Sequence, residues 1–225
     1  MTVGQLRVVG WLGVAAAAVF TVAFLLDPTP PTAGAPASAV LAHIATTGAA
    51  DRAAAFLFAL SAAGLVAFIA GVRAWFENIS SAPRWWGTAM FGGSILAGAS
   101  LVVTSALFFL LSSHAPANGE VAAYLNDAIN YGFVFAGFGV LVTVGFLAAS
   151  MVTTGGPLAL MGRIGVAVTM VQPLFLASTF FASGPLVAGG VATIIGFGFT
   201  GIFILLTAIS VLLFARLMSA AARQS

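Results

Sequence analysis

The sequence predicts an all-α membrane protein, a polytopic transmembrane helical bundle of six spans with both termini in the cytoplasm. One observation is composition: hydrophobic residues make up 61% of the 225 residues and charged residues 5%, whereas soluble domains carry roughly a quarter charged residues. The other is pattern, because the apolar residues fall into six runs near the length of about 20 residues that crosses a bilayer. No polar stretch is long enough for a second domain, so residues 1–225 are expected to form one transmembrane domain.

Short segments rich in Pro, Gly and Ser separate the spans, because these residues interrupt helices. The spans are expected at about Val8–Leu26, Ala53–Phe76, Trp85–Leu111, Ala128–Val152, Ile164–Ala182 and Val191–Leu217. The first connecting segment is long, and its apolar part, Ala37–Ile44, is expected to lie on the membrane or dip into it. A secretory signal is an alternative for the first span, but its 19 apolar residues exceed the usual signal core of about 7 to 15.

The arginines predict the orientation. Positively charged residues beside short loops stay in the cytoplasm, and six of the seven arginines fall on the side that carries both termini, with Arg52 the exception. Both histidines and the acids Asp27, Asp51, Glu120 and Asp127 fall on the opposite side. Spans rich in Ala, Gly and Phe with arginine-flanked loops resemble those of small membrane proteins from bacteria with GC-rich genomes, so we expect a bacterial cytoplasmic membrane.

Missing residue types exclude several kinds of site. The chain has no Lys, so it cannot hold retinal or pyridoxal phosphate as a Schiff base, and no Cys, so it cannot hold an iron–sulfur cluster. Seven scattered arginines do not make a nucleic-acid surface. No charged residue lies in the apolar bodies of the spans, which argues against a proton pump or a voltage sensor. No Gly-x-Ser-x-Gly elbow is present, so we do not expect an enzyme.

Small residues recur every four positions on three spans, which lets helices approach closely in lipid. They are Ala55, Ala59, Ala63, Ala67 and Gly71 on the second span, Ala89, Gly93 and Ala97 on the third, and Ala128, Gly132 and Ala136 on the fourth. This pattern predicts a tight bundle centred on these three spans. A surface for dimerisation is the alternative.

Polar side chains cluster where the fourth span begins, and they are the first candidate ligand site. Glu120, Tyr124, Asp127 and Tyr131 are spaced by four, three and four residues, which places them on one face of a helix. Asn130, with Asn126 one turn earlier, lies beside that face. The set is expected to bind a cation, a polar head group or a partner. The alternative is an interfacial helix whose polar face meets water and head groups.

Gln172, followed by Pro173 near the middle of the fifth span, is a second candidate for ligand binding. Proline bends a helix and frees a carbonyl, and a glutamine amide in a dry setting requires a hydrogen-bond partner. Such broken helices line substrate sites in transporters. A structural kink is the alternative, with Ser94, Ser100, Thr104 and Ser105 of the third span as possible partners.

His43 and His114 are weak candidates for a haem or metal site on the side opposite the termini, because each offers a neutral ring nitrogen. The leading functional hypothesis is a non-enzymatic membrane protein that binds an apolar or lipid-like ligand, or a partner subunit in the membrane. A small-molecule transporter or channel is the alternative, and a haem- or metal-binding subunit is the third. Expected partners are the lipid bilayer and a second copy of the chain or another membrane protein.

Overall fold

The computed structural model describes every residue except 27–29, 115, 117, 182, 185 and 222–225, so Asp27, Ala182 and Arg223 lie outside the described residues. The described elements are helices and no strand, which confirms the all-α prediction. They are α1 (Val3–Leu26), α2 (Ala37–Ile79), α3 (Arg84–Ser113), α4 (Gly119–Thr154), α5 (Gly156–Leu176), a short 3₁₀ helix η1 (Ala177–Phe180) and α6 (Val191–Ala221). Six of these helical segments are long and apolar enough to cross a membrane.

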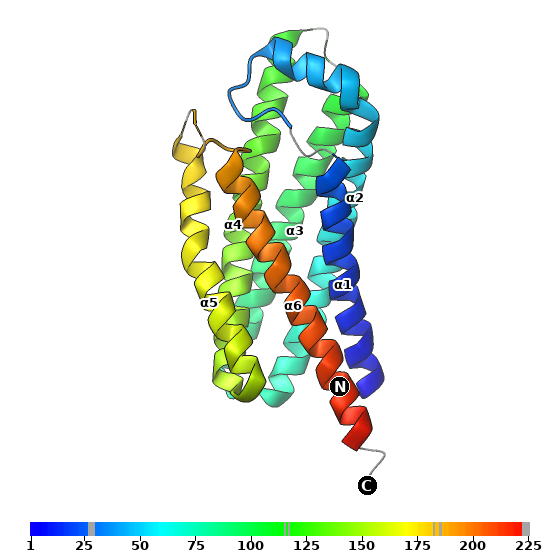
Figure 1. Cartoon of the computed structure of the whole chain (residues 1–225), viewed down its shortest axis with the longest axis vertical. Helices are drawn as coiled ribbons and strands as arrows, with labels where there is room; N and C mark the ends of the chain where they lie inside the picture. The colour runs from blue at the N-terminus through cyan, green and yellow to red at the C-terminus, as the bar shows by residue number, and fades with distance from the viewer. Residues whose placement is uncertain (27–29, 115, 117, 182, 185, 222–225) are drawn as a thin grey trace.

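The helices run up and down along one long axis, with the start of α1 and the end of α6 at the same end of the bundle (Figure 1). We call the opposite end the distal end. Helix α3 packs between α2 and α4, α1 packs against α2, and α5 packs against α4. Helix α6 crosses the bundle obliquely (Figure 1): Gly196 near its start lies against Phe175 of α5, whereas Leu212 near its end lies against Gly10 of α1.

The long helices all exceed the spans predicted for them, and α2 and α4 exceed them by most. Helix α2 has 43 residues and begins at Ala37, so the expected loop segment Ala37–Ile44 is helical. Its first part lies across the distal end before the chain turns down the bundle (Figure 1). This segment is rich in Ala and has no internal Pro, which favours a helix. Helix α4 begins at Gly119, where the Asn118 side chain accepts a hydrogen bond of 2.9 Å from the Glu120 N–H as a helix cap.

Glycines let α3 and α4 approach each other closely. A Cβ atom on Gly93 would lie 2.8 Å from the Gly139 carbonyl oxygen, and one on Gly139 would lie 2.6 Å from the Gly93 carbonyl oxygen. One turn further, the Thr143 hydroxyl donates to the Gly139 carbonyl at 2.8 Å. The predicted close packing of the third and fourth spans is therefore confirmed at Gly93.

The small-residue pattern on α2 does not make one contact face. Ala55 is buried and Gly71 faces Val9 of α1, but Ala63 and Ala67 between them are exposed. The physical reason is helix geometry: residues four apart advance by more than one turn, about 40° each time, so the row winds around the helix. The prediction that the small residues of the second span pack within a tight bundle is therefore wrong at Ala63 and Ala67.

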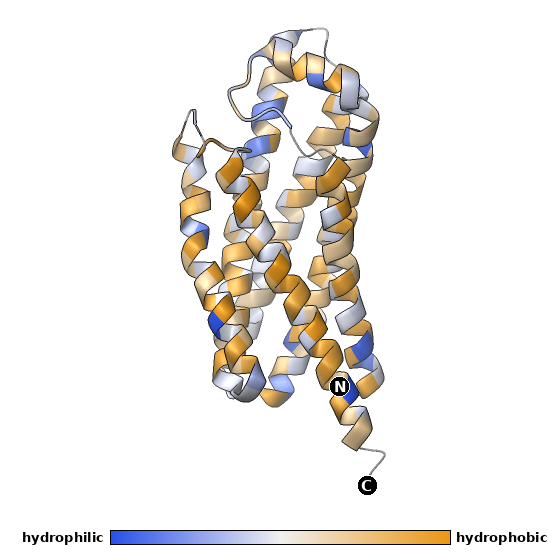
Figure 2. Ribbon diagram, viewed as in Figure 1, coloured by the Kyte–Doolittle hydropathy of each residue, from blue (hydrophilic) through white to orange (hydrophobic). Residues whose placement is uncertain are grey.

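The charged residues lie toward the two ends of the bundle, and the body between them is apolar (Figure 2). Arg7, Arg73, Arg84, Arg163 and Arg216 all occur near helix ends on the side of the termini. Contacts there join distant parts of the chain, for example a 3.2 Å hydrogen bond from Arg7 to the Ser219 hydroxyl. This distribution matches the positive-inside pattern that predicts cytoplasmic termini, and the orientation itself stays a prediction.

Candidate functional site

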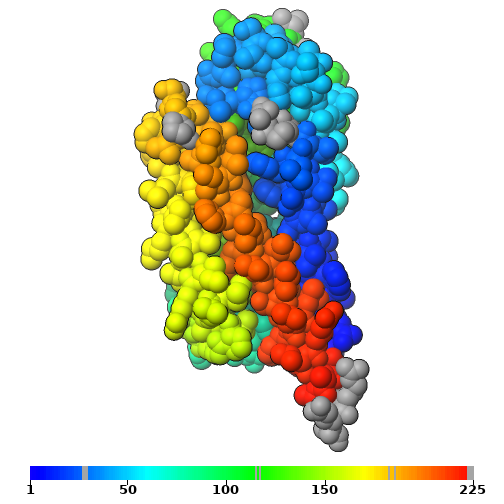
Figure 3. All heavy atoms as spheres, viewed as in Figure 1, coloured from blue at the N-terminus to red at the C-terminus, as the bar shows by residue number. Residues whose placement is uncertain are grey.

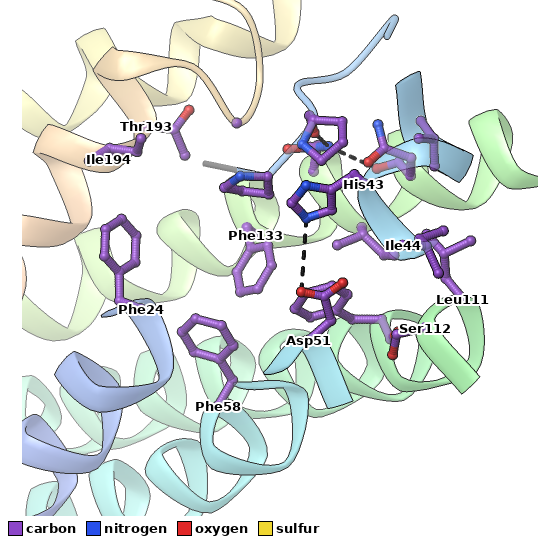
Figure 4. Close-up of a pocket in the computed structure, with 18 of the residues that line it drawn as sticks. Phe24, His43, Ile44, Asp51, Phe58, Leu111, Ser112, Phe133, Thr193 and Ile194 are labelled. Atoms are coloured by element: carbon purple, nitrogen blue, oxygen red, sulfur yellow. Dashed lines mark hydrogen bonds and ion pairs between the residues drawn. The ribbon is translucent and has the colours of Figure 1, made fainter. Parts of the chain in front are cut away.

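A cavity of about 80 Å³ lies inside the distal end of the bundle, and we call it the distal cavity. Five of the long helices contribute to its wall, with the segments that precede α2 and α6. Its labelled lining residues are drawn in Figure 4. A single water needs roughly 10–15 Å³ by the same kind of measure, so the distal cavity is large enough for a group of atoms. Most of its lining is apolar.

Four phenylalanines from four helices close one side of the distal cavity. Phe20 of α1 contacts Phe58 of α2 at 5.3 Å between ring centroids, and Phe58 contacts Phe133 of α4 at 5.2 Å. Phe197 of α6 completes the ring, at 6.2 Å from Phe133 and 6.0 Å from Phe20. We call these four residues the Phe quartet. Edge-to-face and tilted pairs at these distances are attractive, so the quartet holds four helices together at one level.

A second apolar cavity, of about 60 Å³, lies on the other side of the Phe quartet, and we call it the inner cavity. Phe20 and Phe197 line both cavities. The other inner-cavity residues, among them Ser61 and Ile204, come from parts of the helices that lie nearer the chain termini. The quartet therefore stands as a partition between two apolar spaces along the bundle.

The polar part of the distal cavity is built on the first turns of α2. His43, Thr47 and Asp51 are spaced by four residues and share one face of that helix. The Asp51 side chain is fully buried, and its Oδ2 lies 2.8 Å from the Thr47 hydroxyl. Its Oδ1 lies 3.9 Å from Nε2 of His43, the contact drawn as a dashed line in Figure 4. A buried carboxyl group thus faces a mostly apolar cavity.

Asn126, Asp127 and Asn130 of α4 hold the segment that leads into α2. Nδ2 of Asn126 donates to the Thr32 carbonyl at 2.9 Å, and Nδ2 of Asn130 donates to the Pro31 carbonyl at 3.0 Å. Oδ1 of Asp127 accepts a 2.7 Å hydrogen bond from the Gly34 N–H. Pro31 and both asparagines line the distal cavity. The three side chains hold the segment before α2 in place across the distal side of the cavity.

The structure separates the other residues of the predicted stripe from the cavity. Tyr124 is 73% exposed, and Glu120 is also exposed. Tyr131 packs against a small apolar cluster that includes Ala33 and Ala188, and it does not line the cavity. Of the predicted ligand residues at the start of α4, the structure places Asn130 at the cavity, and a binding role for each of them stays a prediction.

Gln172 is buried away from the distal cavity, between α5 and α6. Its Nε2 donates to the Gly196 carbonyl at 3.3 Å and to the Thr200 hydroxyl. These partners lie on α6 rather than on the third span, where partners were expected, because the oblique course of α6 brings its first turns against α5. Gln172 lines a third space, of about 20 Å³, whose wall shares Phe133, Thr193 and Phe197 with the distal cavity. The contacts match the structural interpretation of a satisfied amide beside Pro173, and a ligand role for Gln172 stays a prediction.

The two histidines occupy different surroundings. His43 lines the distal cavity, whereas His114 follows the last turn of α3 and is exposed. Within the described part of the chain, no group of three or more His, Cys, Asp and Glu side chains could hold a metal ion. Shared ligation by His43 and His114 remains a prediction.

Sequence reasoning missed Asp51 and the Phe quartet as cavity residues. The spacing of His43, Thr47 and Asp51 is a helical signal, but it can be recognised only if the segment before the second span is treated as a helix.

Comparison with protein-family models, with curated proteins and with solved structures gives no match. A concave, mostly apolar space with a few buried polar groups is the usual form of a small-molecule site.

Proposed function

We propose that this integral membrane protein binds a mostly apolar, lipid-like ligand in the distal cavity. The observation that carries the proposal is an aromatic cavity within the apolar body of a six-helix bundle. Lipid tails are as apolar as the cavity wall, so burial by itself provides little driving force. The affinity comes instead from van der Waals contacts, because the ligand fills a space whose lining atoms otherwise lack contact partners.

Access from the bilayer supports the same function. The surface is hollowed between α1 and α6 in the distal half of the molecule (Figure 3). The two helices diverge there because α6 leaves α1 to reach α5. Phe24 of α1 and Ile194 of α6 both line the distal cavity. An apolar ligand can therefore approach sideways from the lipid, without crossing water.

Native mass spectrometry of gently extracted protein tests this function with a matched pair of variants. Ile194 lines the distal cavity, whereas the next residue, Ile195, is exposed and does not line it. The unmodified chain is expected to carry a discrete added mass. Ile194→Trp fills the cavity and should remove that mass, and Ile195→Trp should retain it. Equal occupancy in both variants, or a bare chain throughout, would argue against the proposal.

A transporter for the same class of ligand is the second candidate, and the inner cavity favours it. The distal and inner cavities meet at Phe20 and Phe197, so movement of the Phe quartet would join them. Proteoliposomes that contain a fluorescent single-chain lipid analogue give the test. If the protein is a transporter, the analogue should cross the membrane, and it should cross faster in Phe197→Ala because the partition between the two cavities is opened. If the protein only binds, it should take up the analogue without moving it across the membrane.

A further inference from the structure

Apolar binding does not explain why Asp51 lies in the wall of the distal cavity. Its side chain has no exposed surface, and it is one of the few ionisable groups in the lining. A carboxyl group removed from water is unfavourable unless hydrogen bonds replace those that water made. The hydrogen-bond partners of its two oxygens therefore show whether a donor is missing that a ligand could supply.

The described residues satisfy this carboxyl group incompletely. Oδ2 lies 2.8 Å from the Thr47 hydroxyl, but the same hydroxyl lies 2.7 Å from the His43 carbonyl oxygen. A hydroxyl has one proton, so it donates to one of these acceptors at a time. Oδ1 is buried and accepts no hydrogen bond from the described part of the chain. Nε2 of His43 is 3.9 Å from it, which is longer than a hydrogen bond.

A water molecule is a poor candidate for the missing donor to Oδ1 of Asp51. A buried water usually makes two to four hydrogen bonds, and the cavity wall beside Asp51 is mostly apolar. The amide N–H groups of Asn126 and Asn130 already donate to backbone carbonyls. A hydroxyl fixed to an apolar molecule needs only one acceptor there, because its body is satisfied by the aromatic wall.

The cost of burying a further charge favours a neutral donor over a cationic one. Nη1 of Arg52 donates at 2.9 Å to the carbonyl oxygen of Ser112, and Ser112 lines the distal cavity. A positive charge is therefore already fixed at the edge of the site. An ammonium group entering the cavity would be attracted by Asp51, but it would lose more hydration than a hydroxyl does and would also approach this fixed positive charge.

We propose that the ligand of the distal cavity is an apolar alcohol whose hydroxyl donates to Oδ1 of Asp51. This inference rests on the proposed function and adds the chemistry of the ligand's polar end. The apolar body lies against Phe58 and Phe133, and the hydroxyl points toward the first turns of α2, where Figure 4 draws Asp51. A hydrogen bond to a carboxylate is about twice as strong as one between neutral groups, so the hydroxyl contributes both affinity and orientation.

Matched photoaffinity probes test the inference on the full chain in lipid nanodiscs. Each probe has a hexadecyl chain with a diazirine, and the head group is a primary alcohol, its methyl ether or a primary ammonium. Cross-linked residues are mapped by peptide mass spectrometry, and titration gives apparent affinities. The alcohol is expected to label the cavity wall and to bind about tenfold more tightly than the ether, which cannot donate.

Variants of Asp51 identify the acceptor. Asp51→Leu should bind the alcohol and the ether about equally well, because the side chain no longer has an oxygen that accepts the hydroxyl proton. Asp51→Asn keeps one carbonyl oxygen without the charge and should retain part of the preference, and it serves if the leucine variant does not fold. Glu77→Gln is the matched control, because Glu77 is an exposed acid paired with Arg73 at the opposite end of the bundle. Its preference should equal that of the unmodified chain.

The three probes and the Asp51 variants distinguish a failure of this inference from a failure of the proposed function. If no probe labels the cavity, the proposed function fails and the inference fails with it. If the ether labels the cavity as strongly as the alcohol, an apolar ligand is supported and the hydroxyl is refuted. A preference for the ammonium probe, or an alcohol preference that survives Asp51→Leu, also overturns the inference while apolar binding stands.

Discussion

Nδ2 of Asn130, in the middle of the distal half of α4, donates a 3.0 Å hydrogen bond to the carbonyl oxygen of Pro31, in the segment that enters α2. The same nitrogen also donates to the Asn126 carbonyl at 2.9 Å. One buried amide thus fixes a loop against the helix that forms the wall of the distal cavity. The position of that loop decides how far the cavity is covered on its distal side.

Replacement of Asn130 by Ala should loosen this loop. The Pro31 carbonyl loses this donor, whereas the Asn126 carbonyl keeps the backbone N–H of residue 130 within α4. An unsatisfied buried polar group costs about 1–3 kcal/mol. We expect a lower thermal midpoint and faster amide hydrogen exchange in residues 32–35. Asn78→Ala is the control, because the exposed Asn78 also donates to a carbonyl one turn earlier, that of Ala74, but lies at the other end of the bundle. Unchanged exchange in Asn130→Ala would contradict the role given to this amide.

Gly189 allows the loop before α6 to approach Asn130. Its φ is +77°, and a Cβ atom there would overlap Oδ1 of Asn130. Gly184 has a similar φ of +86° but no atom near the Cβ position. Both substitutions by Ala carry the cost of left-handed backbone, about 1–2 kcal/mol, and Gly189→Ala should lower the midpoint further because of the overlap. Equal midpoints for the two variants would show that the close approach does not matter for stability.

Leucine at Ala63 should leave the fold intact, although the four-residue spacing predicts a packed ridge. Ala63 is exposed on the bundle surface, whereas Ala54 on the same helix is fully buried. Adding three carbons at a packed position costs about 1–3 kcal/mol, so Ala54→Leu should destabilise and Ala63→Leu should not. Thermal unfolding in detergent measures both. A loss of assembly specific to Ala63→Leu would instead favour the dimerisation surface.

Leucine at Gln172 should weaken the contact between α5 and α6 and leave ligand binding unchanged. The Thr200 hydroxyl can still donate to the carbonyl four residues earlier, as Thr commonly does in helices. The expected loss is about 1 kcal/mol, seen as a lower midpoint. Because Gln172 does not line the distal cavity, the ligand mass should remain. A stable variant that has lost its ligand would restore Gln172 as a binding residue.

Length and composition determined the class of this protein. Runs of apolar residues separated by Pro and Gly specify membrane-spanning helices because the backbone must satisfy its own hydrogen bonds in lipid. The arginine pattern predicts that the end of the bundle with the termini faces the cytoplasm. The candidate list reached His43 and Asn130, which line the cavity. Both are polar residues beside apolar runs, which sequence inspection finds readily.

Tertiary structure alone decided which polar residues face the cavity and which face each other. The course of α6 gave Gln172 its partner on Thr200 and brought Phe197 to Phe20, and neither pair has a signal in sequence spacing. Asp51 gained its place because α2 begins before the predicted span and folds over the distal end. Contacts inside one helix follow from the periodicity of the chain, whereas contacts between helices depend on crossing angles, which are set by packing of side chains far apart in sequence.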